Sequence, residues 1–258
     1  MTVQNCGGDS EPGRGEQAMA ISCVGLTKRF GDTLAVSDLS FGVPFGAITG
    51  FIGANGSGKT TTMRMITGLV RPTTGSVVIG GVPYGRIARP RQTMGAALDR
   101  IGAHPGHSAR LHLQTIARAA EIAPERVDQV LETVELTADA HRPIGTYSTG
   151  MTQRCALAAA LLGDPTILLL DEPANGLDPG GIRWLRTFLR KQADAGVAVL
   201  VSSHQLAELG AMVDHVVMLH KGRLVMNGPT RELFRITGTD DLEDAFLALT
   251  DSAERSLA

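Results

Sequence analysis

Long apolar runs are the most informative absence from this chain of 258 residues. Although 43% of its residues are hydrophobic, no continuous apolar run approaches the roughly 18 residues that a membrane span requires. The chain can therefore build a sizeable core, but we do not expect it to cross a bilayer. Any pathway through a membrane would have to come from another protein.

The chain also has few cysteines and no large excess of positive or negative charge. The three cysteines, Cys6, Cys23 and Cys155, show no CxxC spacing, which is typical of proteins in a reducing cytoplasm. The formal net charge is −2 and no basic tract appears, so electrostatics gives no reason to expect a nucleic-acid partner.

A glycine-rich loop stands out against this ordinary composition. Residues Gly53–Thr60 match the pattern G-x-x-x-x-G-K-[ST] at every fixed position, the pattern of a phosphate-binding loop. An apolar segment at 47–52 precedes the loop and a helical segment at 61–66 follows it, which is the strand, loop and helix order that phosphate binding needs. The competing interpretation is a glycine-rich turn with a chance lysine. We predict a site for a nucleoside triphosphate.

Each residue type in this loop would contribute to phosphate binding in a specific way. Gly53, Gly56 and Gly58 let backbone N–H groups turn toward phosphate oxygens, and the start of the helix adds its positive dipole end. Lys59 would reach the β- and γ-phosphates, and Thr60 would offer a hydroxyl to Mg²⁺. The candidate residues for binding the nucleotide in this region are Gly53, Asn55, Gly56, Ser57, Gly58, Lys59, Thr60 and Thr61.

A second candidate site follows an apolar run at 167–170, where Asp171, Glu172 and Pro173 end the run. Such a run is typical of a strand buried on both faces of a parallel sheet. Ligands of α/β sheets bind at the carboxyl ends of the strands, so Asp171 could hold Mg²⁺ and Glu172 could polarise an attacking water. The competing interpretation is a strand capped by two solvated acids.

The segment Tyr147–Arg154 carries a family resemblance. The chain resembles an ATP-binding subunit of an ABC transporter, in which a signature of the form LSGGQ precedes the acidic strand and begins a helix. Ser148 and Gly150 occupy its serine and its second glycine, whereas Thr149 and Met151 depart from the first glycine and the glutamine. These departures are similar to those in drug- and bacitracin-resistance exporter subunits.

The resemblance implies a fold and an assembly. The expected fold is the α/β P-loop NTPase fold of ABC ATPases, with a parallel core sheet, an antiparallel β subdomain and a helical insert. In the family, two subunits associate head to tail, and each nucleotide lies between one phosphate loop and the partner's signature, here Ser148 and Gly150. Asp178 matches the D-loop that lines this seam, and we also expect it to cap the helix that begins at Pro179.

Three further residues follow from the resemblance. His204 ends the apolar strand at 197–201 and matches the switch histidine, so the expected catalytic residues are Glu172, His204 and Lys59. Phe30 matches the aromatic residue that stacks on adenine, although a core aromatic residue is the competing interpretation. Asp99 replaces the usual glutamine and is a third candidate for Mg²⁺, with Thr60 and Asp171.

The domain boundaries are predicted from composition and periodicity. We expect a disordered leader at 1–19, an ABC ATPase domain at 20–250 with helices from about 95 to 158, and a tail at 251–258. The sequence leaves open whether Met1 or Met19 begins the natural chain. Predicted elements include antiparallel strands at 34–43 and 77–79, a helical stripe at 127–134, a hairpin at 215–219 and 223–226, and a final helix at 241–249.

These observations predict an ATP-hydrolysing subunit of an ABC exporter that moves a drug or antimicrobial peptide outward. The implied ligands are ATP and Mg²⁺. The implied partners are a polytopic membrane subunit and a second ATP-binding subunit. The second subunit is a separate chain because the sequence contains no repeat of the ATPase unit, and we expect a homodimer, with a heterodimer as the alternative. The expected location is the inner face of the plasma membrane. Alternatives are a subunit for another cargo, such as a lipid, polysaccharide or ion, and an ABC ATPase outside transport.

Overall fold

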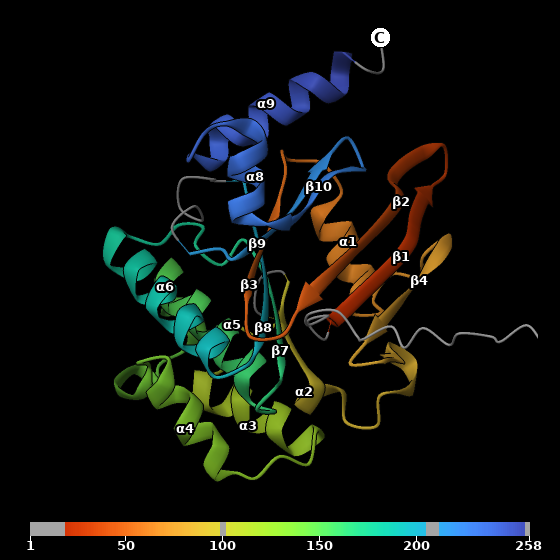
Figure 1. The fold of residues 1–258 in the computed structure, drawn as a ribbon. Coiled ribbons are helices and arrows are strands. Elements are labelled where there is room, and N and C mark those ends of the chain that lie inside the picture. Colours follow the sequence, from red (N-terminus) through yellow and green to blue (C-terminus); the bar gives the residue numbers. More distant parts are fainter. Residues whose placement is uncertain (1–18, 99–101, 205–211, 256–258) are drawn as a thin grey trace, which may run out of the picture.

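The computed structural model describes residues 19–98, 102–204 and 212–255, and it contains two β-sheets (Figure 1). The larger sheet has the strand order β10-β9-β3-β8-β7-β6, and the smaller has the order β2-β1-β4-β5. All neighbours in the larger sheet are parallel except β9 and β10, which form an antiparallel hairpin. Its strands are β3 (Ile48–Ile52), β6 (Met94–Ala97), β7 (Ile167–Asp171), β8 (Ala198–Ser203), β9 (His215–His220) and β10 (Arg223–Pro229).

The core sheet is buried on both faces because its strands are almost wholly apolar. In β7, Leu168 and Leu170 pack into one hydrophobic cluster, while Ile167 and Leu169 pack into the other. This division follows the two-residue period of a strand. The strand therefore ends with Asp171 emerging from the core at the carboxyl edge of the sheet.

The smaller sheet is antiparallel and covers one face of the core sheet across a helix. Its strands are β1 (Met19–Phe30), β2 (Thr33–Pro44), β4 (Thr74–Ile79) and β5 (Val82–Pro83). Helix α1 (Lys59–Ile66) lies between the two sheets (Figure 1), where Met63 and Ile66 are fully buried. This packing fixes the start of α1, and with it the loop at 53–60.

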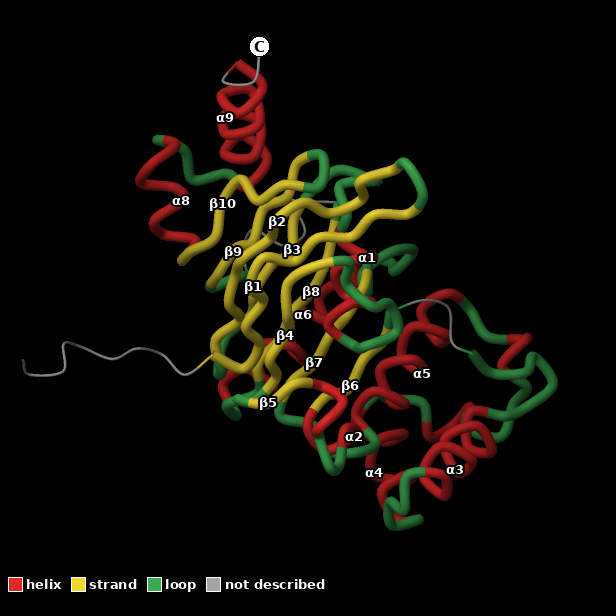
Figure 2. Tube along the Cα trace, turned by 90° about the vertical axis from the view of Figure 1, so that its right-hand side faces the viewer, coloured by secondary structure: helices red, strands yellow, loops and turns green. Residues whose placement is uncertain are grey.

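Helices cover the other face of the core sheet. Helices α3, α4 and α5 form an insert that projects from the core sheet away from β1 and β2 (Figure 2), and α6 packs beside it. The α-helices after α1 are α2 (Pro90–Thr93), α3 (Ala109–Ala119), α4 (Glu125–Thr133), α5 (Thr149–Leu161), α6 (Pro179–Asp194), α8 (Thr230–Thr237) and α9 (Leu242–Arg255). Short 3-10 helices span Tyr84–Arg86, Thr137–Asp139 and Ile144–Thr146.

The expected fold is confirmed, as are the phosphate-loop unit, the antiparallel strands and the hairpin. Three boundaries were wrong. The helical part does not begin at 95, because Met94–Ala97 pairs with β7 as the edge strand of the core sheet. Met19, placed in the leader, is the first residue of β1; residues 1–18 lie outside the described part of the chain.

The carboxyl-terminal boundary was also wrong. The final helix spans Leu242–Arg255 rather than ending at 249, so it includes residues placed in the tail. Helix α8 was not predicted. Within the parts of the chain that the structure covers, no helix is both long and apolar enough to cross a membrane.

Candidate functional site

The phosphate loop connects β3 to α1 and is shaped by close backbone contacts. A Cβ atom at Gly53 would lie 2.5 Å from the carbonyl oxygen of Leu219 and 2.5 Å from Ser57 Oγ, so only glycine fits there. Gly58 has φ +103°, a left-handed conformation that glycine adopts without strain. The loop is therefore held in one shape by the sequence itself.

Two side chains of the loop are ready for an anionic ligand. The hydroxyl of Ser57 is buried and has no hydrogen-bond partner, which is unusual for a buried polar group. Lys59 donates to the carbonyl oxygens of Gly53 at 2.6 Å and Ala54 at 3.3 Å. Burial lowers the pKa of its ammonium group, against the opposing influence of Glu172 and Asp171. A phosphate group would supply the negative partner that these donors lack.

Asp171 and Thr60 meet beside the loop. Thr60 Oγ1 donates to Asp171 Oδ2 at 2.8 Å, which brings together a helix start and a strand end 111 residues apart. Both groups are oxygen donors of the kind that Mg²⁺ prefers. The residues present therefore fit the predicted magnesium site. Asp99, the third candidate, lies outside the described residues.

Ser202 is a site residue that the sequence analysis did not assign. Its hydroxyl donates to the second carboxylate oxygen of Asp171 and accepts a hydrogen bond of 2.9 Å from the backbone N–H of Glu172. Ser202 is fully buried and pairs in register with Asp171. A signal was available, because Ser202 is a polar residue at the end of an apolar strand that precedes His204.

Glu172 and His204 lie together at the carboxyl edge of the core sheet. Glu172 Oε2 lies 2.7 Å from His204 Nδ1, and the two side chains are 25% and 35% exposed. Glu172 has φ +50°, a left-handed conformation that residues with a Cβ atom rarely adopt. The resulting turn directs its side chain out of the strand toward His204.

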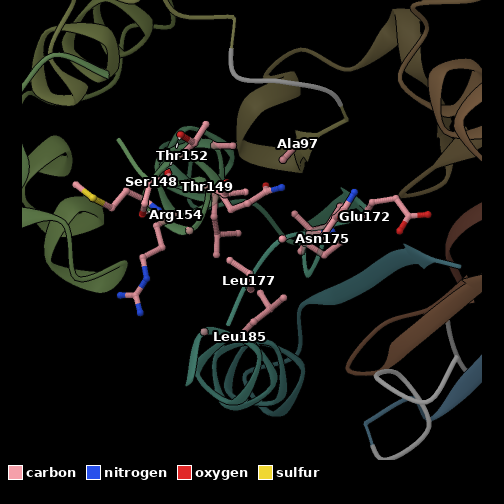
Figure 3. A pocket seen from close by; sticks show the side chains of 18 of the residues that line it. Ala97, Ser148, Thr149, Thr152, Arg154, Glu172, Asn175, Leu177 and Leu185 are labelled. Carbon is pink, nitrogen blue, oxygen red and sulfur yellow. Dashed lines mark hydrogen bonds between the residues drawn. The ribbon is translucent and has the colours of Figure 1, made fainter. Parts of the chain in front are cut away.

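The signature residues line a cleft of about 1050 Å³ between α5 and α6, and Asp171 and Glu172 line the same cleft. Ser148 and Thr149 lie at one end of this cleft, and Glu172 lies at the other, with Asn175 between them (Figure 3). Ser148 is exposed and caps α5 by accepting a hydrogen bond of 3.2 Å from the N–H of Met151. Of the residues in the described ranges, none from the phosphate loop lines this cleft.

The remaining candidates are distributed as follows. Asp178 caps α6 by accepting a hydrogen bond of 2.7 Å from the N–H of Gly181, as predicted, and it lines the same cleft as Gly150. Phe30 is 50% exposed, so its interpretation as a core aromatic residue is wrong. The Nζ atom of Lys28 lies 4.8 Å from the centre of the Phe30 ring. Asn55 and Gly56 are exposed at the loop tip.

The structure thus joins a phosphate loop, two carboxylates and a histidine in one site, the arrangement of a nucleotide hydrolase. A protein-family model described as ABC transporter matches residues 36–175. The chain is 42% identical over 203 residues to the uncharacterized ABC transporter ATP-binding protein YhcH of Bacillus subtilis, covering 78% of this chain and 67% of that protein. It is 38% identical over 212 residues to the bacitracin transport ATP-binding protein BcrA of Bacillus licheniformis, covering 81% of this chain and 69% of that protein.

Solved structures share the same fold. The ATP-binding subunit of an ABC transporter aligns with a TM-score of 0.81 and 26% identity, over 90% of this chain and 99% of that chain. A dimeric ATP-binding cassette bound to ADP and Pi aligns with a TM-score of 0.73 and 22% identity, over 81% of this chain and 98% of that chain.

The chain therefore belongs to the family of ABC transporter ATP-binding proteins. It is an ATP-binding protein and an ATPase. It is similar both to a relative named as uncharacterized and to one named for bacitracin transport.

Proposed function

We propose that this chain is the ATP-hydrolysing subunit of an exporter that moves an antibiotic or antimicrobial peptide outward through a separate membrane subunit. The observation that carries the choice of cargo is the 38% identity to the bacitracin transport ATP-binding protein over 81% of this chain. The departures of Thr149 and Met151 from the signature also favour this branch of the family. A subunit for another cargo is the alternative.

The binding roles follow from the geometry of the loop. In our proposal, Gly53, Gly58 and the buried hydroxyl of Ser57 form the phosphate cradle, and Lys59 exchanges its two carbonyl partners for phosphate oxygens. Thr61 lies in the first turn of α1, whose N-terminus contributes its positive dipole end. Phe30 is available for stacking on the base because half of its surface is exposed.

The proposed magnesium site consists of Thr60 Oγ1 and Asp171 Oδ2, which are 2.8 Å apart. A magnesium ion bound there would neutralise charge on the phosphates during transfer. Ser202 keeps the Asp171 carboxylate in place by donating to its other oxygen.

Turnover is assigned to Glu172 and His204. In our proposal, Glu172 accepts a proton from the attacking water, and His204 orients the Glu172 carboxylate through their 2.7 Å contact. The N–H of Glu172 donates to Ser202, so its backbone is also fixed.

We further propose a head-to-tail pair of subunits. ATP-binding subunits of this family dimerise and pair with membrane subunits. The exposed positions of Ser148 and Asp178, and the half-exposed Gly150, on a cleft that the phosphate loop does not line support a role toward a partner's nucleotide. Two copies of this chain would form two equivalent sites.

The membrane partner is proposed to dock beside the helical insert of α3, α4 and α5. The complex would then lie on the inner face of the plasma membrane. ATP-driven closure of the two subunits would move this docking surface as a rigid body and so couple hydrolysis to the pathway.

The test is co-expression with the membrane protein encoded beside this chain in a host that is sensitive to bacitracin and related peptides. The wild-type chain should lower susceptibility and drug accumulation. Lys59→Ala should abolish this effect, because it removes the phosphate ligand. Lys191→Ala, at an exposed position in the last turn of α6, is the matched control and should behave as wild type.

Two results would count against the proposal in different ways. Unchanged susceptibility across a broad panel of antibiotics and peptides would refute the efflux assignment and leave the ATPase intact. Protection that persists with Lys59→Ala would refute the assigned coupling of transport to nucleotide binding.

A further inference from the structure

Two helices begin side by side at the signature cleft. Ser148 caps α5 and Asp178 caps α6, and both residues line the cleft. In the proposed dimer, both would face the nucleotide of the partner subunit. Their relative position therefore matters for assembly.

The segment that precedes α6 contacts the first turn of α5. A Cβ atom at Gly176 would lie 2.8 Å from the methyl group of Thr149, and Gly176 has φ +74°. A Cβ atom at Gly150 would lie 3.5 Å from the Leu177 side chain. The glycine at 176 thus makes room for the threonine that replaces the usual signature glycine.

A second contact joins the same helices further along. Arg154 lies six residues after Ser148, and Trp184 lies six residues after Asp178. The Arg154 guanidinium carbon lies 4.2 Å from the centre of the Trp184 ring, and Trp184 stacks on Phe188 with ring centres 5.5 Å apart. At a rise of 1.5 Å per residue, six residues place this contact roughly 9 Å along each helix.

Arg154 is itself held from the helical insert. Its Nη1 group donates to the carbonyl oxygen of Val134 at 3.0 Å and to the carboxylate of Glu135, at the end of α4. Its side chain is only 21% exposed, which strengthens an interaction between a cation and an aromatic ring. Arg154 therefore ties α4, α5 and α6 together at one point.

We propose that Arg154 and Trp184 are positioning residues that keep Ser148 and Asp178 at a fixed spacing, so that both form one preformed surface for the nucleotide of a second subunit. One contact at the helix starts would leave α5 free to tilt relative to α6. The second contact removes that freedom. The inference rests on the proposed two-subunit site.

Loss of the contact should weaken the ATP-dependent association of two subunits and leave nucleotide binding by one subunit unchanged. Without the Arg154–Trp184 contact, only a fraction of subunits has the correct spacing, and the apparent affinity for closure falls by that fraction. The known strength of such contacts predicts an increase of about 3- to 30-fold in the ATP concentration needed for half-maximal dimerisation.

The experiment uses the full chain with Glu172→Gln, in which hydrolysis does not dissolve the dimer. Dimerisation is followed by light scattering during ATP titration for Arg154→Met, Trp184→Leu and the double variant. Nucleotide affinity is measured separately at protein concentrations too low for dimerisation. Emission from Trp184, the single tryptophan of the chain, reports whether Arg154 still contacts the ring.

The matched control is Arg110→Met. Arg110 is 24% exposed and pairs with Asp128, which is 63% exposed, while Arg154 is 21% exposed and pairs with Glu135, which is 61% exposed. Arg154→Lys keeps the positive charge and should therefore raise the ATP midpoint less than Arg154→Met does. Trp184→Phe keeps an aromatic ring and replaces Trp184→Leu if that variant unfolds.

The proposal predicts that Arg154→Met and Trp184→Leu raise the ATP midpoint equally, that the double variant adds nothing further, and that Arg110→Met and the affinity of the monomer stay unchanged. Additive effects, or no shift of the midpoint, would overturn it while the dimer proposal stands. If the parent Glu172→Gln chain does not dimerise with ATP, the two-subunit site fails and this inference fails with it.

Discussion

His204 Nδ1 lies 2.7 Å from Glu172 Oε2, and this contact joins the residues that follow two neighbouring parallel strands. An ionised carboxylate can only accept, so the Nδ1 atom carries the proton and donates. The contact therefore selects one tautomer of the imidazole and leaves Nε2 directed elsewhere. It also fixes the Glu172 carboxylate before any substrate arrives.

Replacing Glu172 by glutamine should remove turnover and preserve binding. A glutamine cannot accept the proton of the attacking water, and general-base catalysis typically contributes about 10²- to 10⁴-fold in rate. Binding should persist because Lys59 and Thr60 are unchanged. Phosphate release and nucleotide affinity, measured on the same preparation, would test both parts.

The control for that variant is Glu121→Gln. Glu121 is an exposed glutamate that also has a positive φ, +54°, so it reproduces the change of charge in the same backbone conformation away from the site. Its ATPase rate should equal that of the wild type. A Glu172→Gln chain that hydrolyses ATP at the wild-type rate would remove Glu172 from its assigned role.

Alanine at position 53 should destroy the phosphate cradle. The added Cβ would meet Leu219 O and Ser57 Oγ, each at 2.5 Å, and overpacking of this kind typically costs about 1–3 kcal/mol. Calorimetric titration should detect no ATP binding, and thermal unfolding should shift downward. Gly85→Ala, where an added Cβ has nothing within 4 Å, should change neither quantity.

Removal of the ring at Phe30 should weaken binding without affecting the fold. Stacking of a base on an aromatic side chain is worth about 1–3 kcal/mol, so Phe30→Ala should raise the Kd for ATP by about 5- to 150-fold. Phe30→Tyr should bind as the wild type does. Val24→Ala, which shortens another exposed apolar side chain of β1, provides the comparison, and equal affinities for Phe30→Ala and Val24→Ala would exclude stacking.

His215 should make the fold sensitive to acid. Burial lowers the pKa of His215 below its ordinary value of 6.5, although Asp214 opposes the shift, and its buried Nδ1 atom has no partner. The unfolded chain then binds the proton more readily, so the free energy of unfolding falls as the pH drops from 6.5 toward the folded pKa. Chemical denaturation of His215→Asn at about pH 7.5 and 5.5 should show a smaller loss than the wild type. Equal losses would contradict this assignment.

The sequence predicted that Asp171, Glu172 and His204 lie close together, because these residues follow recognisable strands. The strand at 167–170 is a continuous apolar run, and the residues that follow parallel strands meet at one edge of the sheet. Asp171, Glu172 and His204 could therefore be assigned to one site without knowing the strand order. Ser202 was missed because its role depends on the register of β8 with β7.

Other features could not be read from the sequence because they depend on contacts between distant segments. Strand β6 has only four residues, and a Cβ atom at Gly95 would lie 2.1 Å from Ala160 O, so its place in the sheet is fixed by α5. Helix α8 has eight residues, too few for a clear helical period. The fit of Thr149 against Gly176 is likewise a property of the folded chain.

The left-handed backbone of Glu172 has a consequence for the evolution and engineering of this protein. With φ +50°, a residue that carries a Cβ atom is less stable than glycine by roughly 1 kcal/mol. Glycine at this position would relieve that strain and raise the melting temperature of a chain that no longer hydrolyses ATP. A screen for thermostability alone would therefore favour inactive variants at position 172, because glycine there increases stability whereas turnover requires glutamate.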